Sequence, residues 1–329
     1  MFPKMITAAM MAASLLAAPA ALAKELKLAD FQPPTHFALE RVYKPMSDAI
    51  SAATNGEVTI KAYMGGELGP GPAEQYNRAV DGVADIVFAL PGYTASTFPM
   101  TLLSELPGVI DPINDIEKII ETQEMLDPEY RRVKLLALWN NQPGVLFTAS
   151  KPIRKLEDLK GLKIRVPSRN AGLVLEAWGG SPVSMPATEI YNAMQTGVID
   201  GAMIDMSALT AFRLAEVTKY VTVGMDTATS QFFLVMNRDS FNELTEDQQK
   251  AVLEAGKDAA RNGHAAWVEV SDKAQEEFVG MEGKELISLS DEEVAKFNAA
   301  SEPVIEKVIA EVEATGVPAR AYVEALKND

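Results

Sequence analysis

One arginine lies where a strand should end, and its chemistry suits the capture of a carboxylate. In the segment Gly161-Leu-Lys-Ile-Arg-Val-Pro167, apolar and basic residues alternate, which predicts a strand at 162–166 with Lys163 and Arg165 on the same side. Ligands of open α/β sheets bind beyond the carboxyl ends of the strands, and a guanidinium there can hold a carboxylate through two parallel hydrogen bonds. The residues alone leave a second interpretation open, an exposed arginine at a strand end.

Groups for catalysis or metal binding are scarce. The two histidines, His36 and His264, lie far apart in the sequence, and neither has Asp, Glu or His neighbours at metal-ligand spacing. His264 falls inside a predicted helix and is expected to be a packing or surface residue. The chain has no cysteine, no Gly-x-Ser-x-Gly nucleophile elbow, no P-loop and no Gly-x-Gly-x-x-Gly turn after a strand. We therefore expect no enzyme activity, no metal and no cofactor.

The first 23 residues have the composition of a secretory signal peptide. Lys4 provides the positive start, residues 5–16 are small and apolar, and Ala21-Leu-Ala23 matches a signal-peptidase site. The apolar run is short for a membrane span, although an uncleaved anchor is the alternative. We expect cleavage after Ala23 and a mature chain in the periplasm. Acidic residues outnumber basic ones by 46 to 30, and the resulting net charge of −16 argues against nucleic acid or an anionic membrane as a partner.

An α/β fold is expected to position Arg165, because short apolar runs alternate with amphipathic segments along the chain. The pattern predicts helices at 37–53, 73–80 and 188–197. It predicts strands at 25–31, 58–63, 84–89, 135–139, 146–149, 162–166, 198–204 and 231–236.

The last third of the chain is predicted to be largely helical. Thr245 and Gln248 form a capping box before a long helix, at about 246–278. A helix of this length spans about 45 Å, which is longer than one lobe is wide, so we expect it to lie across two lobes. Ser290 can cap a further helix.

Two lobes are also indicated by a short internal sequence repeat. Gly82-Val-Ala-Asp85 and Gly197-Val-Ile-Asp200 each join a helix end to a strand. No Pro/Ser-rich linker divides the chain, which predicts several crossings between the lobes. We expect lobe 1 to comprise 24–142 plus 231–270, and lobe 2 to comprise 143–230 plus 271–329.

Several separated motifs resemble the DctP family, the extracytoplasmic solute receptors of tripartite ATP-independent periplasmic (TRAP) transporters. They are Asp158-Leu-Lys-Gly-Leu-Lys-Ile-Arg-Val-Pro167, Glu189–Gly201, Met236-Asn-Arg238, Leu244–Gln249, Gly66-Glu-Leu-Gly69 and Gly82-x-x-Asp85. The resemblance covers nearly the whole mature chain. It implies a two-lobed periplasmic binding protein, type II-like, in which each lobe is a mixed sheet flanked by helices and a long helix bridges both. It also implies small organic acids as ligands, a small and a large TRAP membrane subunit as partners, and a monomer.

Arg165 matches the carboxylate-binding arginine of that family, whereas other positions depart from the family pattern. Some members have a second arginine about 20 residues earlier, where this chain has Val145 or Leu146. Members often have asparagine where this chain has Ile204 and Asp205. A dicarboxylate would lack its second clamp. We therefore expect a monocarboxylate held by Arg165, or a ligand whose amine or hydroxyl faces Asp205.

Further side chains are candidates for the cleft because they follow or lie in strands that should end there. The aromatic candidates, which could equally belong to the core, are Trp139, Tyr93 and Phe232. The polar candidates are Asn140, Asn141 and Ser168. Ligand that bridges both lobes would favour the closed state over the open one. The expected function is capture of a small organic solute for a TRAP transporter; presentation of the solute to a membrane sensor is the alternative.

Overall fold

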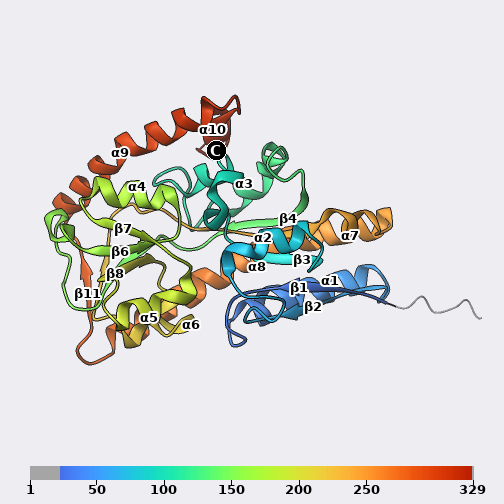
Figure 1. Ribbon diagram of the computed structural model, residues 1–329, viewed down its shortest axis with the longest axis horizontal. Coiled ribbons are helices and arrows are strands. Elements are labelled where there is room, and N and C mark those ends of the chain that lie inside the picture. Colours follow the sequence, from blue (N-terminus) through green and yellow to red (C-terminus); the bar gives the residue numbers. More distant parts are fainter. Residues whose placement is uncertain (1–22, 328–329) are drawn as a thin grey trace, which may run out of the picture.

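The computed structural model describes residues 23–327 and shows two lobes along the long axis of the molecule (Figure 1). The predicted signal segment lies outside the described residues, except for Ala23. Lobe 1 is built on a five-stranded sheet with the order β2 (Val58–Tyr63), β1 (Lys24–Ala29), β3 (Ile86–Ala89), β10 (Gln231–Asn237) and β4 (Val133–Asn140). Lobe 2 is built on a six-stranded sheet with the order β11 (Glu285–Ser288), β9 (Tyr220–Val223), β5 (Val145–Thr148), β8 (Gly201–Ile204), β6 (Lys163–Val166) and β7 (Ser181–Ser184).

Both sheets are mixed. In lobe 1, β1 pairs in parallel with β2 and β3, whereas β10 is antiparallel to β3 and β4. In lobe 2, β6 is parallel to β7 and β8, β9 is parallel to β11, and β5 runs antiparallel to its two neighbours. Strands β3, β5 and β10 are buried along their whole length, as expected for strands covered on both faces. The predicted two-lobed α/β fold is confirmed.

Helices cover the sheets. They are α1 (Lys44–Ala53), α2 (Gln75–Val80), α3 (Ile116–Glu121), α4 (Arg169–Ala177), α5 (Ile190–Gln195), α6 (Ala208–Ala211), α7 (Arg238–Asn242), α8 (Glu246–Val279), α9 (Asp291–Glu313) and α10 (Ala319–Lys327). A π-helical turn, η1 (Leu39–Tyr43), leads into α1. The 3₁₀ turns are η2 (Pro72–Glu74), η3 (Pro91–Thr97), η4 (Thr101–Glu105), η5 (Gln123–Leu126), η6 (Leu156–Leu159), η7 (Ala187–Glu189) and η8 (Leu214–Glu216).

Helix α8 bridges the lobes, as predicted. The capping box at Thr245 and Gln248 fixes its start, and its 34 residues span about 50 Å. Two glycines seven residues apart let it lie directly on β4. A Cβ at Gly256 would come within 2.3 Å of a β4 carbonyl, and one at Gly263 within 2.7 Å of the Trp139 ring. Farther along, Phe278 packs into the core of lobe 2.

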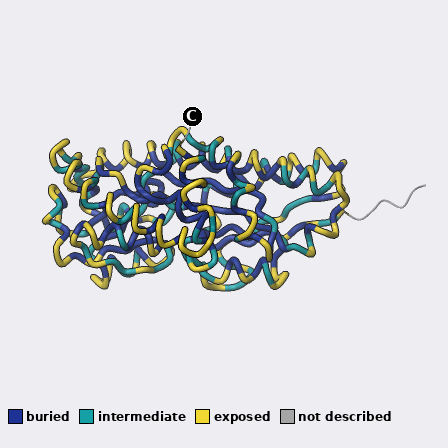
Figure 2. The backbone as a smooth tube through the Cα atoms, turned by 90° about the horizontal axis from the view of Figure 1, so that it is seen from above, coloured by how far each residue is buried: buried dark blue, intermediate teal, exposed yellow. Residues whose placement is uncertain are grey.

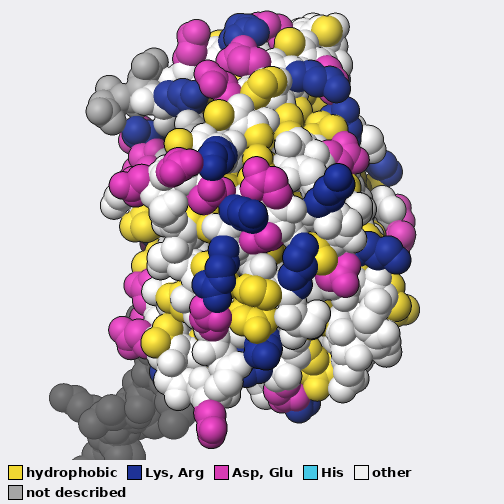
Figure 3. Space-filling model, turned by 90° about the vertical axis from the view of Figure 1, so that its left-hand side faces the viewer, with side chains coloured by type: hydrophobic (Ala, Val, Ile, Leu, Met, Phe, Trp, Pro, Cys, Tyr) yellow, Lys and Arg dark blue, Asp and Glu magenta, His cyan; other side chains and the backbone are white. Residues whose placement is uncertain are grey.

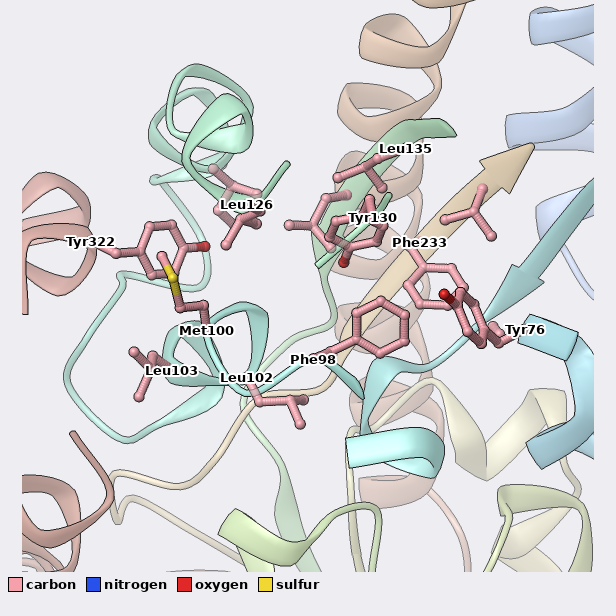
Figure 4. Packing of buried hydrophobic residues seen from close by; sticks show 14 of the residues in the cluster. Tyr76, Phe98, Met100, Leu102, Leu103, Leu126, Tyr130, Leu135, Phe233 and Tyr322 are labelled. Atoms are coloured by element: carbon pink, nitrogen blue, oxygen red, sulfur yellow. The ribbon is translucent and has the colours of Figure 1, made fainter. Parts of the chain in front are cut away.

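The C-terminal helices correct the predicted lobe boundary, which assigned all of 271–329 to lobe 2. The first half of α9 does pack on lobe 2, where Phe297 contacts the ring of Trp178. Its second half and α10 instead pack on the core of lobe 1, around Tyr322. Figure 4 shows Tyr322 reaching from α10 towards Met100 and Leu126. Helix α9 is therefore a second helical crossing between the lobes; it lies along the upper edge of the view in Figure 1, whereas α8 runs through the middle.

The buried backbone runs continuously from one lobe to the other (Figure 2). The links β4–β5 and β9–β10 cross between the two sheets, so the lobes share four connections with α8 and α9. Charged side chains of both signs are interspersed at the lobe 2 end of the molecule (Figure 3). Among residues 23–327, we find no helix that combines the length and the apolar character needed to cross a membrane.

Candidate functional site

A cavity lies between the lobes, where strand ends of both sheets meet. Its empty volume is about 400 Å³, including the part that is open to solvent. The cavity is lined by Phe31, Gln32, His36, Leu90, Tyr93, Asn141, Arg165, Ala187, Ile204, Asp205, Ser207, Ala208, Phe212, Ser230, Phe232 and Trp267.

Arg165 is buried on β6, with 1 % of its surface exposed. Its Nε donates to the Met185 carbonyl at 2.9 Å, and its Nη1 donates to the Met203 carbonyl at 3.3 Å. Its Nη2 lies 3.4 Å from the Tyr93 hydroxyl oxygen, to which it donates. These bonds fix the plane of the guanidinium. They engage three of its five N–H donors and leave two for a ligand.

Tyr93 connects the lobes at the edge of the cavity. It belongs to η3 of lobe 1, and its hydroxyl oxygen accepts hydrogen bonds from Arg165 and from the Ala187 amide of lobe 2, the latter at 2.9 Å. Burial raises the pKa of the Tyr93 phenol, while the positive charge of Arg165 opposes this shift. Burial also lowers the pKa of the Arg165 guanidinium. Asp205 and Glu189, the acidic side chains that interact with Arg165, form no ion pair with it. A carboxylate ligand would bring a negative charge into direct contact with this buried guanidinium.

Asp205 is buried directly after β8, and protein donors surround its carboxylate. Asn141 Nδ2 donates to Oδ2 at 2.8 Å. Oδ1 accepts bonds from the Ser207 amide and hydroxyl, and one from the Ser271 hydroxyl on α8 at 3.3 Å. Burial raises the pKa of the Asp205 carboxyl, against the effect of these hydrogen bonds. Asn141 also accepts a bond from the Ser230 amide, so this network ties both lobes to α8.

Aromatic rings form much of the remaining wall. Trp267 of α8 packs against Phe232 of β10 with ring centroids 4.7 Å apart. His36 of lobe 1 lies 5.5 Å from Trp267 and 6.0 Å from Phe212 of lobe 2. Phe31 and Tyr93 are 6.1 Å apart between centroids. A flat, apolar ligand body fits such a wall, because rings of this kind stack on other rings.

Five of the predicted site residues line the cavity together: Tyr93, Asn141, Arg165, Asp205 and Phe232. Trp139 does not, since α8 covers its indole at Gly263 and its ring packs against that of Trp267, which does line the cavity. Ser168 does not line it either. Its hydroxyl caps α4 and donates to buried Glu105 at 2.7 Å, at a separate contact between the lobes. Asn140 turns away and donates to the Pro112 carbonyl.

Sequence reasoning missed Gln32, His36, Phe212 and Trp267. His36 was treated only as a possible metal ligand, yet it is buried in the wall of the cavity. Burial lowers its pKa to about 3, so the ring is neutral at physiological pH and too weak a base for proton abstraction. One signal was available for Gln32, since it follows β1 at the edge where ligands bind. His264 packs against the Ile113 carbonyl, outside the cavity.

The arrangement suits binding. A fixed cation with unused donors lines a partly enclosed space with several aromatic walls, and the walls come from both lobes. Within the part of the chain that the structure describes, we find no group of three or more His, Cys, Asp or Glu side chains that could hold a metal ion.

Solved structures with the same architecture hold acids. A marine metagenome TRAP solute binding protein specific for aromatic acid ligands, from an unidentified microbe, was crystallised with 3-hydroxybenzoate; it is 28% identical, covering 93% of this chain and 97% of that chain, with a TM-score of 0.86. A TRAP periplasmic solute binding protein from Bordetella bronchiseptica with bound (R)- and (S)-mandelate is 27% identical, covering 92% and 97%, with a TM-score of 0.83. One from Pseudomonas putida F1 with bound D-glucuronate is 26% identical, covering 93% and 98%, with a TM-score of 0.78.

A family model described as bacterial extracellular solute-binding protein, family 7 (DctP), matches residues 28–311. This span includes the sheet of lobe 2, the sheet of lobe 1 apart from the first four residues of β1, α8 and nearly all of α9. The chain therefore belongs to the DctP family of bacterial extracellular solute-binding proteins.

Proposed function

We propose that the protein captures a small aromatic monocarboxylate between its lobes and delivers it to the small and large membrane subunits of a TRAP transporter in the periplasm. One observation carries the proposal: among the cavity-lining side chains described above, Arg165 is the one cation, and six of the other fifteen lining residues carry aromatic rings. The solved relatives that hold 3-hydroxybenzoate and mandelate support this ligand class. The family binds solutes without converting them, which supports a non-catalytic role.

Capture follows a two-state scheme. The ligand bridges the Arg165 face of lobe 2 and the aromatic face of lobe 1, so it favours the closed state by its difference in affinity for the two states. A dicarboxylate is less suitable because Val145 and Leu146 provide no second cation. An amine held by Asp205 is also less suitable, since Asn141, Ser207 and Ser271 already donate to that carboxylate.

The test is calorimetry of the mature chain with benzoate, succinate and D-glucuronate. We expect benzoate to bind more tightly than the other two. Arg165→Ala should lower the affinity for benzoate by at least about thirtyfold, because truncating a buried partner of a carboxylate costs about 2–5 kcal/mol. Arg154→Ala is the matched control, since this arginine is exposed and pairs with Glu285 far from the cavity. Equal affinity of the Arg165 variant, or preference for D-glucuronate, would overturn the proposal.

A further inference from the structure

The loop after β1 holds Gln32 rigidly at the cavity. The backbone N–H of Gln32 donates to Asp30 Oδ1 at 2.8 Å, and the backbone carbonyl of Gln32 accepts from the Gly65 backbone N–H at 2.7 Å. Tyr43 donates to the other Asp30 carboxylate oxygen at 2.7 Å. Gly65 has φ of +65°, a conformation that glycine adopts without strain. The Gln32 backbone is thus fixed from several sides, and 3 % of the residue is exposed.

The hydrogen bonds of His36 define which atoms of Gln32 face the ring. The Ala38 amide donates to His36 Nδ1 at 3.2 Å, so Nδ1 carries no hydrogen. A neutral imidazole has one N–H, which must therefore be on Nε2. Burial keeps the ring neutral by lowering its pKa to about 3. His36 Nε2 accordingly is a donor, yet it lies 3.1 Å from Gln32 Nε2, which is also a donor.

A donor on His36 requires an acceptor on Gln32. The side-chain amide of Gln32 must therefore be turned by a half-turn, so that its carbonyl oxygen lies next to His36. The NH₂ group then lies at the other end of the amide. That other end is buried and has no hydrogen-bond partner among the described residues. An amide NH₂ without an acceptor is costly in a buried site, and Gln32 is one of the residues that line the cavity.

We propose that Gln32 offers this free amide N–H to the ligand and selects carboxylates that carry a second oxygen acceptor, such as a ring hydroxyl. The inference deepens the proposed function and rests on it. Arg165 then anchors the carboxylate, the rings enclose the body of the ligand, and Gln32 recognises a substituent. His36 acts as a positioning residue, because its Nε2–H fixes the orientation of the Gln32 amide.

The test compares benzoate with 2-, 3- and 4-hydroxybenzoate by calorimetry, for the wild type and for Gln32→Met. The readout is the affinity ratio of each hydroxybenzoate to benzoate, so a general effect of the substitution on the pocket cancels. In the wild type we expect one isomer to bind about three- to tenfold more tightly than benzoate, the range of one net hydrogen bond. In Gln32→Met this ratio should fall to within about twofold of one. Gln195→Met, an exposed position at the end of α5, should keep the wild-type ratio.

Two results would overturn the inference: an unchanged ratio in Gln32→Met, or no preferred isomer in the wild type. Failure of the proposed function looks different, because then benzoate itself would not bind or Arg165→Ala would bind it equally well. The orientation of the amide has an independent test. Nitrogen-15 NMR of the His36 ring, assigned with a His264→Gln variant, should show hydrogen on Nε2 at neutral pH. Hydrogen on Nδ1 would contradict the inference whatever the ligand.

Discussion

Gly92 of lobe 1 lies against Ser168 of lobe 2 with no space for a side chain between them. A Cβ at Gly92 would lie 3.0 Å from the Ser168 Cβ and 3.1 Å from the Pro167 carbonyl oxygen. This contact is beside the cavity, between η3 and the start of α4. The backbone of one lobe therefore meets the other lobe here, and the absence of a side chain at position 92 allows this close approach.

Gly92→Val should hold the lobes apart without unfolding either one. We expect ligand affinity to fall by about fivefold or more, since overpacking of this kind costs about 1–3 kcal/mol. Calorimetry gives the affinity, and small-angle X-ray scattering with saturating ligand should give a larger radius of gyration than for the wild type. Gly280→Val is the control, because Gly280 is exposed after α8. Equal affinity and equal compaction would show that this contact does not limit closure.

Arg165→Lys should keep the charge and still lose much of the binding. A lysine has no planar fork, so it cannot contact the Met185 carbonyl and Tyr93 while presenting two parallel donors to a carboxylate. We expect the affinity for benzoate to fall by about tenfold to a hundredfold, which corresponds to about 1.4–2.8 kcal/mol. Arg154→Lys serves as the surface control. If lysine bound benzoate as well as arginine, charge alone would account for the site.

Asp205→Asn should destabilise the protein. The carboxylate accepts bonds from Asn141, Ser207 and Ser271, whereas an asparagine would direct its own NH₂ at one of these donors. We expect a loss of about 1–3 kcal/mol in the free energy of unfolding, the cost of unpaired buried polar groups. Urea unfolding measures it, with Asp272→Asn on the exposed face of α8 as control. Unchanged stability would show that the network is dispensable.

Glu105 should make stability depend on pH. Burial raises the pKa of this carboxyl to about 8 from an ordinary 4.5, against the hydrogen bond from Ser168. Between these pH values the folded chain keeps a proton that the unfolded chain has released. The free energy of unfolding should therefore fall by roughly 1 kcal/mol per pH unit as pH rises between about 5 and 7, relative to Glu105→Gln.

This difference is measured by urea unfolding of both chains at several pH values. Glu105→Gln keeps a group that can contact Ser168 and cannot ionise. Glu324→Gln, at an exposed position of α10, should follow the wild type. Parallel curves for the wild type and Glu105→Gln would mean that the carboxyl ionises freely in the folded protein.

Local sequence patterns predicted most of the elements, because these depend on neighbours in the chain. Strand β2 and the helix that begins at Thr245 agree with the predicted ranges almost to the residue. The destination of α10 could not be predicted in this way. Tyr322 and its neighbours would be apolar on one face whichever lobe they covered, and their partner, η4, lies more than 200 residues earlier.

The same limit explains the site. Arg165 and Asp205 could be proposed because each lies at a strand end. Trp139 and Phe232 are paired neighbours on β4 and β10, on the same face, so alternation could not separate them. Their surroundings differ because of α8: Gly263 of this helix covers the Trp139 ring, whereas Phe232 lines the cavity. Gln32 and His36 follow β1 in an irregular loop, where no periodicity indicates the direction of a side chain.

The position of β10 has a consequence for synthesis of the chain. The ribosome completes β3 and β4 long before β10, yet β10 is the strand that lies between them. Until residue 231 and its successors emerge, both early strands have an open edge, and open edges of apolar strands promote aggregation. A nascent chain that pauses or stops before residue 231 should therefore depend on a chaperone to avoid aggregation.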